Sequence, residues 1–157
     1  MCVFLSRGGI WGSNQMQKRE TKFLIEELQK AKKLVLPGVG AFPNGMKNLE
    51  KLDLKNFIKE KVTEGLPLLG ICLGMQMLFE RSTEFKITEG LNLINGEVDL
   101  IGNNKIKLPH MGWNNLQINK PNHPIFMNIS ENEQFYFVHS YFLKTVEKKQ
   151  VLAEAYY

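Results

Sequence analysis

The stretch that decides the fold is Leu66-Pro67-Leu68-Leu69-Gly70-Ile71-Cys72-Leu73-Gly74. Its apolar run, Leu66 to Ile71, is typical of a parallel strand that is covered by helices on both faces. The run leads directly to Cys72, which stands in a G-x-C-x-G pattern, and the residues from Leu73 to Glu80 are predicted to form a helix. A strand, a sharp turn and a helix in this order form the cysteine version of a nucleophile elbow.

An elbow of this kind presents the sulfur of Cys72 at the end of the strand. The two flanking glycines are needed because a side chain there would collide with the neighbouring strand or helix. The first N–H groups and the dipole of the following helix favour the thiolate, and the N–H of Leu73 would point at a developing oxyanion. The alternative is an ordinary buried cysteine, but the glycine pair and the flanking elements favour a nucleophile.

Helix and strand signals alternate on both sides of the elbow. Helical spacing over Phe23 to Lys33 leads into the apolar run Leu34 to Leu36, and Asp53 is a good N-cap for a helix that ends before Gly65. Farther on, Asn95-Gly96 predicts a hairpin turn, and strands are predicted over 105–108, 113–118, 135–143 and 151–156. The predicted fold is α/β: an open, mostly parallel, flavodoxin-like sheet with helices on both faces and added antiparallel strands.

Composition limits the class of protein. At 157 residues, with 43% hydrophobic and 23% charged residues, the chain is predicted to form one globular domain, 1–157. The net charge of +4 comes from lysines scattered over helices, which indicates solvated faces and no nucleic-acid partner. The apolar run from Cys2 to Leu5 is too short for a signal or a membrane span. Two cysteines without metal-ligand spacing indicate a reducing cytoplasm and no metal, with one disulfide between them as the open alternative.

The loop Pro37-Gly38-Val39-Gly40 follows the first confident strand. In open α/β sheets such loops at the carboxyl ends of strands line the active crevice. A main-chain N–H near Val39 or Gly40 would then supply a second oxyanion donor. A plain tight turn is an equally good interpretation of this loop by itself.

Four motifs together resemble the class I, triad-type glutamine amidotransferases. They are Pro37-Gly38-Val39-Gly40-Ala41-Phe42, Leu69-Gly70-Ile71-Cys72-Leu73-Gly74-Met75-Gln76, Pro109-His110-Met111-Gly112-Trp113-Asn114 and Tyr136-Phe137-Val138-His139-Ser140-Tyr141. Their order and spacing are similar to those of the family over about 25–157. The third motif is most similar to the glutaminase subunits of imidazole glycerol phosphate synthase, in histidine biosynthesis.

The resemblance implies a role for each matching position. Cys72 would attack the side-chain amide of glutamine, and the main-chain N–H groups of Val39 and Leu73 would form the oxyanion hole. The remaining implied substrate contacts are Gly38, Gly40, Gln76 as the glutamine-binding amide, Glu84 as the acid that meets the α-amino group, and the backbone of His139, Ser140 and Tyr141 around the α-carboxylate. No cofactor is implied.

The resemblance also implies a partner. Ammonia is protonated in water, so enzymes of this family pass it through a shielded path to a synthase. The partner is a (β/α)₈-barrel cyclase, with which the glutaminase forms a heterodimer. Trp113, Asn114 and Tyr136 are candidates for contacts near that joint.

The sequence departs from the family at both ends. The family's base is a His followed two residues later by Glu, and none of the histidines of this chain, His110, His123 and His139, has a Glu in that position. The catalytic His and Glu are therefore not present, so turnover is expected to be poor and the chain is expected to be truncated. Residues 1–22 are atypical. Missing elements would expose apolar faces of 34–36 and 66–71.

Several alternatives remain open. A paralogous amidotransferase could supply ammonia for surface-polysaccharide sugar synthesis. An inactive remnant could act only as a binding module. An unrelated cysteine hydrolase would share the elbow, but it would leave the other three motifs unexplained.

Overall fold

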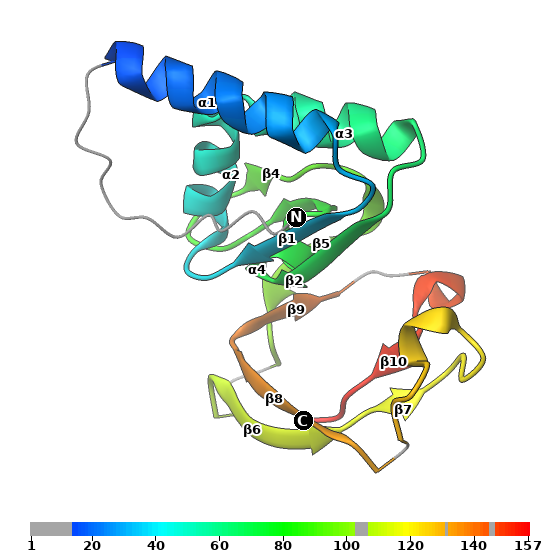
Figure 1. The fold of residues 1–157 in the computed structure, drawn as a ribbon. Coiled ribbons are helices and arrows are strands. Elements are labelled where there is room, and N and C mark those ends of the chain that lie inside the picture. The colour runs from blue at the N-terminus through cyan, green and yellow to red at the C-terminus, as the bar shows by residue number, and fades with distance from the viewer. Residues whose placement is uncertain (1–13, 103–106, 131, 145–146) are drawn as a thin grey trace. The chain divides into compact units, whose positions relative to one another are not determined.

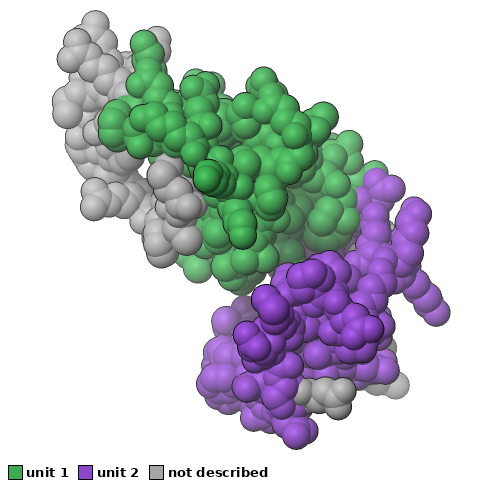
Figure 2. Space-filling model, turned by 45° about the vertical axis from the view of Figure 1, so that its right-hand side comes forward, with its two compact units in different colours: residues 1–94 green, residues 95–157 purple. Residues whose placement is uncertain are grey.

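The computed structural model describes residues 14–102, 107–130, 132–144 and 147–157 (Figure 1). The chain forms two compact units, residues 1–94 and residues 95–157, which Figure 2 shows in different colours. Each unit is described by itself. The prediction of a single domain stays a prediction.

Unit 1 is an α/β structure built on the parallel pair of strands β1 and β2. Its elements, in chain order, are α1 (Asn14–Gln29), β1 (Leu34–Gly38), α2 (Phe42–Lys51), α3 (Leu54–Thr63), β2 (Leu68–Cys72), α4 (Leu73–Gln76), β3 (Phe79–Ser82) and β4 (Thr88–Glu89). Strands β1 and β2 pair from Leu34↔Leu68 to Gly38↔Cys72. The predicted parallel core is thus confirmed, and β3 and β4 pair antiparallel in a separate sheet.

The helices of unit 1 differ from the prediction in detail. The helix predicted from Phe23 to Lys33 begins earlier, at Asn14, and ends at Gln29. The helix after Asp53 is confirmed as α3, but Asp53 has a left-handed backbone (φ 53°) and its side chain makes no capping hydrogen bond. Helix α2 was not predicted. It begins at Phe42, and Pro43 in its first turn is typical of a helix start because proline lacks the N–H that a first turn leaves unpaired.

One face of the β1–β2 sheet is buried and the other is partly open. Leu34 and Leu36 are buried beneath α1 and α3, which lie over this face in Figure 1 and contribute Leu28 and Phe57 to the same apolar cluster. On the opposite face Leu69 and Ile71 are 45% and 49% exposed. The exposure of apolar side chains that was expected at 34–36 and 66–71 is therefore found in β2 but not at Leu34 and Leu36, which are buried.

The predicted helix from Leu73 to Glu80 is wrong beyond its first turn. Helix α4 ends at Gln76, and the chain then enters strand β3 at Phe79. The main chain around Phe79 forms tertiary hydrogen bonds instead of helical ones: the N–H of Asn92 donates to its carbonyl oxygen at 3.1 Å. Tertiary pairing has overridden a local helical preference.

Unit 2 consists of antiparallel strand pairs. Its elements are β5 (Ile94–Leu100, of which only Ile94 belongs to unit 1), β6 (His110–Asn115), β7 (Gln117–Ile118), the 3₁₀ turn η1 (Pro124–Phe126), β8 (Gln134–His139), β9 (Tyr141–Leu143), η2 (Lys148–Gln150) and β10 (Ala153–Glu154). Strand β5 pairs with β9, β6 with β8, and β7 with β10. The added antiparallel strands of the prediction are confirmed.

Some boundaries in unit 2 were predicted wrongly. Asn95-Gly96 does not form a hairpin turn but lies inside β5, where Gly96 has a φ of 139°. The strand predicted over 151–156 is reduced to Ala153–Glu154. Of the strand predicted over 105–108, the first two residues lie outside the described residues and the other two are not in a strand. No helix in the described part of the chain has the length and apolarity that a membrane span requires.

Candidate active site

Cys72 occupies the corner between β2 and α4. It is the N-cap of α4 and has φ 54° and ψ −121°, a conformation that residues with a Cβ rarely adopt. Its thiol is free and the residue is exposed. The elbow predicted from the glycine pattern therefore exists, and the interpretation of Cys72 as an ordinary buried cysteine is wrong.

The two glycines of the pattern are required by close backbone contacts. A Cβ on Gly74 would lie 1.7 Å from the carbonyl oxygen of Leu36, and a Cβ on Gly70 would lie 2.6 Å from the Cα of Met75. Real Cβ atoms do not approach other atoms below about 3.0 Å. Helix α4 thus packs directly against β1 and β2, and this contact fixes the direction in which the chain leaves Cys72.

The loop after β1 lies at the same edge of the sheet as Cys72. Gly38, the last residue of β1, is the registered partner of Cys72, which ends β2. Val39 follows and is 77% exposed, and Gly40 has a φ of 94°. The structure thus brings Gly38 opposite Cys72, with Val39 and Gly40 next in the chain. The part of Val39 and Leu73 as oxyanion donors stays a prediction.

Helix α4 is a single turn, so its dipole stabilises a thiolate at Cys72 less than the dipole of the longer predicted helix would. Its four residues offer first-turn N–H groups, beginning with that of Leu73, but the dipole of a long helix is missing. Gln76 ends this turn and is partly exposed. Its side of the helix therefore remains accessible, and its binding of glutamine stays a prediction.

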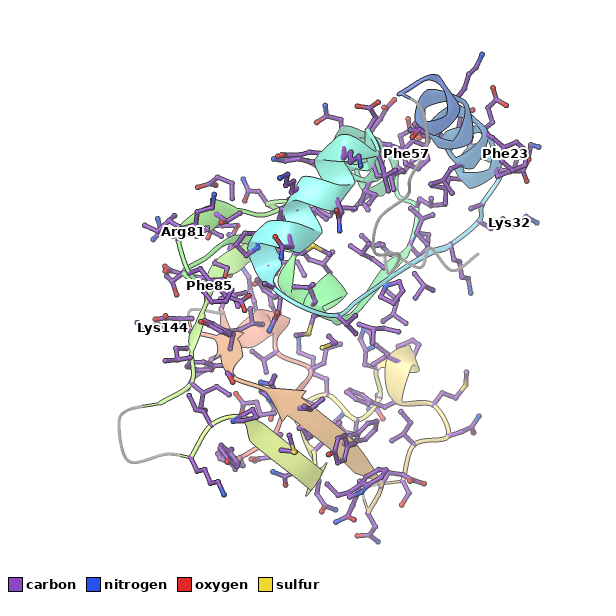
Figure 3. All side chains as sticks on the ribbon, turned by 90° about the vertical axis from the view of Figure 1, so that its left-hand side faces the viewer. Phe23, Lys32, Phe57, Arg81, Phe85 and Lys144 are labelled. Atoms are coloured by element: carbon purple, nitrogen blue, oxygen red, sulfur yellow. The ribbon has the colours of Figure 1, made fainter. Side chains whose placement is uncertain are left out.

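Glu84 lies just after β3 and makes a contact that the sequence did not indicate. Its Oε2 accepts a hydrogen bond of 2.7 Å from the main-chain N–H of Phe42, the first residue of α2. The fully buried Ser82 accepts a 3.1 Å bond from the main-chain N–H of Glu84. Figure 3 shows the neighbouring Arg81 and Phe85, which is 85% exposed, at the margin of unit 1. Glu84 is thus held between a buried strand end and the start of a helix.

In unit 2, two histidines form a hydrogen-bonded pair across β6 and β8. His110 Nδ1 and His139 Nε2 are 3.2 Å apart, and His139 Nδ1 is 3.0 Å from the carbonyl oxygen of Tyr141. A carbonyl only accepts, so His139 Nδ1 carries the proton, and in the neutral pair His110 Nδ1 donates to His139 Nε2. Burial, followed by the nearby His139, holds the pKa of His110 below its ordinary value.

His110 packs against two aromatic rings. Its ring stacks against Phe137 at 4.9 Å and against Tyr157 at 4.0 Å between centroids. His123 is exposed and accepts a hydrogen bond from the N–H of Ile125 at the start of η1. Ser140 connects β8 to β9 and its carbonyl oxygen accepts from the N–H of Ile101. The substrate contacts of His139, Ser140 and Tyr141 stay predictions.

The β6–β8 ladder presents an exposed apolar face, here called the aromatic face. It consists of the cross-strand pairs Met111↔Val138 and Trp113↔Tyr136, all four of which are more than half exposed. The rings of Trp113 and Tyr136 meet edge to face at 5.5 Å. Asn114 points to the other face of the ladder because side chains alternate along a strand, and it donates to the carbonyl oxygen of Tyr156.

Among the described residues, no three His, Cys, Asp or Glu side chains gather in a way that would hold a metal ion.

Comparisons with known proteins agree with the motifs. Residues 13–156 match the family "Glutamine amidotransferase class-I". Among similar proteins are three named "Imidazole glycerol phosphate synthase subunit HisH". The one from Halalkalibacterium halodurans is 50% identical over 137 residues, that from Lactococcus lactis 51% over 117, and that from a Geobacillus species 47% over 154. These alignments cover 84%, 74% and 92% of this chain.

The chain is shorter than these relatives. It spans 64%, 57% and 72% of their respective lengths. A solved structure, "Crystal structure of glutamine amidotransferase", shares the fold with a TM-score of 0.62 and 18% identity, over 90% of this chain and 75% of the other. Both the predicted fold class and the predicted likeness are confirmed, and the chain belongs to the class-I glutamine amidotransferase family.

Proposed function

We propose that the chain is the amide-cleaving part of a glutaminase that supplies ammonia for imidazole glycerol phosphate synthesis. The observation that supports this most directly is the exposed Cys72, held at φ 54° at the end of β2 and opposite Gly38 of the neighbouring strand. A nucleophile that must reach an amide carbon needs such a position, at the open edge of the sheet.

The proposed reaction uses the sulfur of Cys72 as nucleophile. The thiolate attacks the side-chain amide carbon of glutamine, and the carbonyl electrons move onto the oxygen, which accepts hydrogen bonds from the N–H groups of Leu73 and Val39. When the carbonyl re-forms, the C–N bond breaks and the nitrogen leaves with a proton as ammonia. Water then hydrolyses the γ-glutamyl thioester to glutamate and regenerates the thiol. A reducing cytoplasm is the proposed setting because it keeps Cys72 reduced.

Substrate recognition is proposed for the residues that the resemblance to the family implies. Gln76 would bind the glutamine, Gly38 and Gly40 would line the chain of the substrate, and Glu84 would meet its α-ammonium group. His139, Ser140 and Tyr141 would hold the α-carboxylate by their main chain. Proton delivery to the leaving nitrogen requires a His-x-Glu pair. Residues 1–157 contain no such pair.

An alkylating analogue of L-glutamine tests the proposal. The analogue should label Cys72 with saturation kinetics, L-glutamine should protect against labelling, and D-glutamine should not. Cys72→Ala, which lacks the thiol, is the negative control. Iodoacetamide needs no binding site, so its reaction reports whether the thiol is accessible. Folded protein in which iodoacetamide modifies Cys72 but the glutamine analogue does not would contradict the proposed function.

We also propose that the aromatic face is where a cyclase partner docks. Large exposed aromatic residues are enriched at protein interfaces, and the paired rings of Trp113 and Tyr136 form a rigid anchor. Asn114 faces the other way and is not part of this proposal.

Affinity measurements with the cyclase test this docking. Trp113→Ala should weaken binding by about 30-fold or more, the effect of losing about 2 kcal/mol at a binding hot spot. Phe85→Ala, which removes another highly exposed ring, is the matched control and should leave affinity within about twofold. Equal losses for the two variants would mean that the aromatic face is not the specific contact.

A further inference from the structure

Glu84 takes the place of a missing cap on helix α2. Ala41, the N-cap residue, has no side chain that could accept a hydrogen bond from the first turn. The carboxylate of Glu84 instead bonds the N–H of Phe42 at 2.7 Å, from 42 residues farther along the chain. Negative charge at a helix N-terminus is favourable, and hydrogen bonds to an ionised acceptor are stronger than neutral ones. The contact is therefore a firm attachment of α2 to the end of β3.

Phe42 is also the far end of the loop that carries the proposed oxyanion donor. At the near end, Gly38 is fixed by its register with Cys72. Between these two ends Val39 is 77% exposed, and a Cβ at Gly40 would find no atom within 4 Å. Side-chain packing thus gives the middle of the loop little support. Its conformation depends on its two ends, of which one is held by Glu84.

We propose that Glu84 is a positioning residue for the oxyanion loop, in addition to its proposed contact with the α-ammonium group. A carboxylate has two oxygens with about four acceptor sites, so one oxygen can hold the N–H of Phe42 while the other receives the ammonium. Binding of the substrate and placement of the loop are then coupled through one side chain. This inference rests on the proposed function, because it assumes that Val39 donates to the oxyanion.

The test separates the two roles with a reagent that has no α-amino group. p-Nitrophenyl acetate acylates a cysteine through a tetrahedral oxyanion: the C–S bond forms, the C–O bond breaks and p-nitrophenolate leaves. No general acid is needed because the leaving group is stable as an anion. The rate of the p-nitrophenolate burst thus reports on the oxyanion donors, and iodoacetamide, whose reaction forms no oxyanion, reports on access to Cys72.

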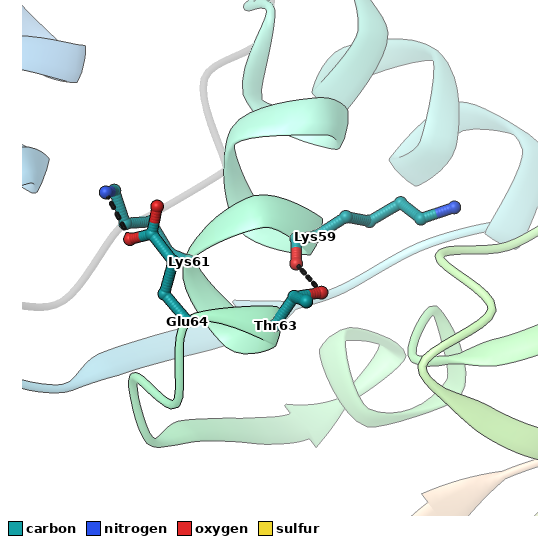
Figure 4. Close-up of polar contacts among 4 residues, drawn as sticks. All are labelled: Lys59, Lys61, Thr63 and Glu64. Carbon is teal, nitrogen blue, oxygen red and sulfur yellow. Dashed lines mark hydrogen bonds and ion pairs between the residues drawn. The ribbon is translucent and has the colours of Figure 1, made fainter.

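Three variants of the full chain are compared with the wild type. In Glu84→Gln the amide oxygen still accepts from Phe42 but carries no charge, whereas Glu84→Ala removes both functions. Glu64→Ala is the matched control because Glu64 pairs with Lys61 at the end of α3, as Figure 4 shows. Glu84→Ala should slow the burst by about tenfold, less than the 10²–10³ expected for outright loss of a donor. Glu84→Gln and Glu64→Ala should stay within about threefold of the wild type, and all should react equally with iodoacetamide.

The outcomes distinguish this inference from the proposed function. Both Glu84 variants should lose reactivity toward the glutamine analogue. If Glu84→Ala loses that reactivity but keeps the full burst rate, Glu84 only binds the substrate and the positioning role is wrong. If the glutamine analogue does not label Cys72 in the wild type, the proposed function is wrong. Should Glu84→Ala not fold, Glu84→Asp serves instead: its shorter side chain keeps the charge but not the bond to Phe42, so an unchanged burst would overturn the inference.

Discussion

Replacing Gly74 with alanine should disrupt the corner that presents Cys72. The new Cβ would lie 1.7 Å from the carbonyl oxygen and 2.6 Å from the carbonyl carbon of Leu36. A real Cβ keeps about 3.0 Å, so the methyl group and the strand must separate by about 1.3 Å, the difference between 3.0 and 1.7. Both atoms it meets belong to the main chain of buried β1, so no side-chain rotation relieves the clash.

The energetic cost follows from this geometry. Overpacking a core usually costs about 1–3 kcal/mol when side chains adjust, and here the backbone must move, so we expect about 3 kcal/mol or more. Alanine in a helical turn recovers up to about 1 kcal/mol of that. The total free energy of unfolding of a small domain is about 5–15 kcal/mol. The unfolding free energy falls by about 1–3 kcal/mol per molar of urea, so the midpoint of the urea unfolding transition should fall by about 1 M or more.

Urea unfolding monitored by circular dichroism measures the change, and Gly65→Ala is the control. Gly65 has a φ of 93° with open space around its Cβ position, so alanine there suffers only backbone strain of about 1–2 kcal/mol. Gly74→Ala should be clearly less stable than Gly65→Ala and should lose labelling of Cys72 by the glutamine analogue. A Gly74→Ala protein with a wild-type midpoint and wild-type labelling would refute the steric account of the elbow.

Two further predictions concern charge. Because the pKa of His110 is lowered in the folded protein, the unfolded chain binds more protons than the folded one just below the ordinary value of 6.5. The free energy of unfolding should therefore be fully maintained above pH 6.5 and should fall as the pH drops below it. Urea titrations between about pH 5 and 8 should show that this dependence of the unfolding free energy on pH is smaller in His110→Phe. The exposed ion pair of Lys144 with Asp99, at 2.7 Å, should contribute less than about 1 kcal/mol. Lys144→Met should therefore shift the urea midpoint only slightly, and 1 M salt should shrink that shift; a large, salt-independent loss would contradict a surface pair.

The parts of the fold that the sequence predicted correctly are those with local signals. The apolar run before Cys72 and the glycines beside it are contiguous, and both features are found in the structure as β2 and its elbow. The prediction of a helix over 73–80 failed because the main chain after Gln76 forms hydrogen bonds with 90–93, outside the range of a helical turn, and a helical preference within 73–80 does not encode these bonds. The Asn95-Gly96 hairpin failed for a similar reason: Val98 is wholly buried in β5, so the strand continues through the turn signal.

The candidate site was predicted to a similar extent. Cys72 and its partner Gly38 could be placed at one edge of the sheet because parallel strands end together. The bond between Glu84 and the main chain of Phe42 could not be predicted, since it joins residues far apart in sequence and one partner is a backbone amide. Pro43 could have indicated the missed start of α2, and no comparable signal exists for buried Ser82.

The backbone angles of Cys72 carry a consequence for sequence variation. Glycine adopts positive φ at little cost, whereas a side chain in such a sparsely populated region costs about 1–3 kcal/mol. Cys72→Gly should therefore raise the free energy of unfolding and remove the nucleophile. Directed evolution that selects for heat resistance alone would tend to remove the thiol, so any such library built on this protein needs position 72 held constant.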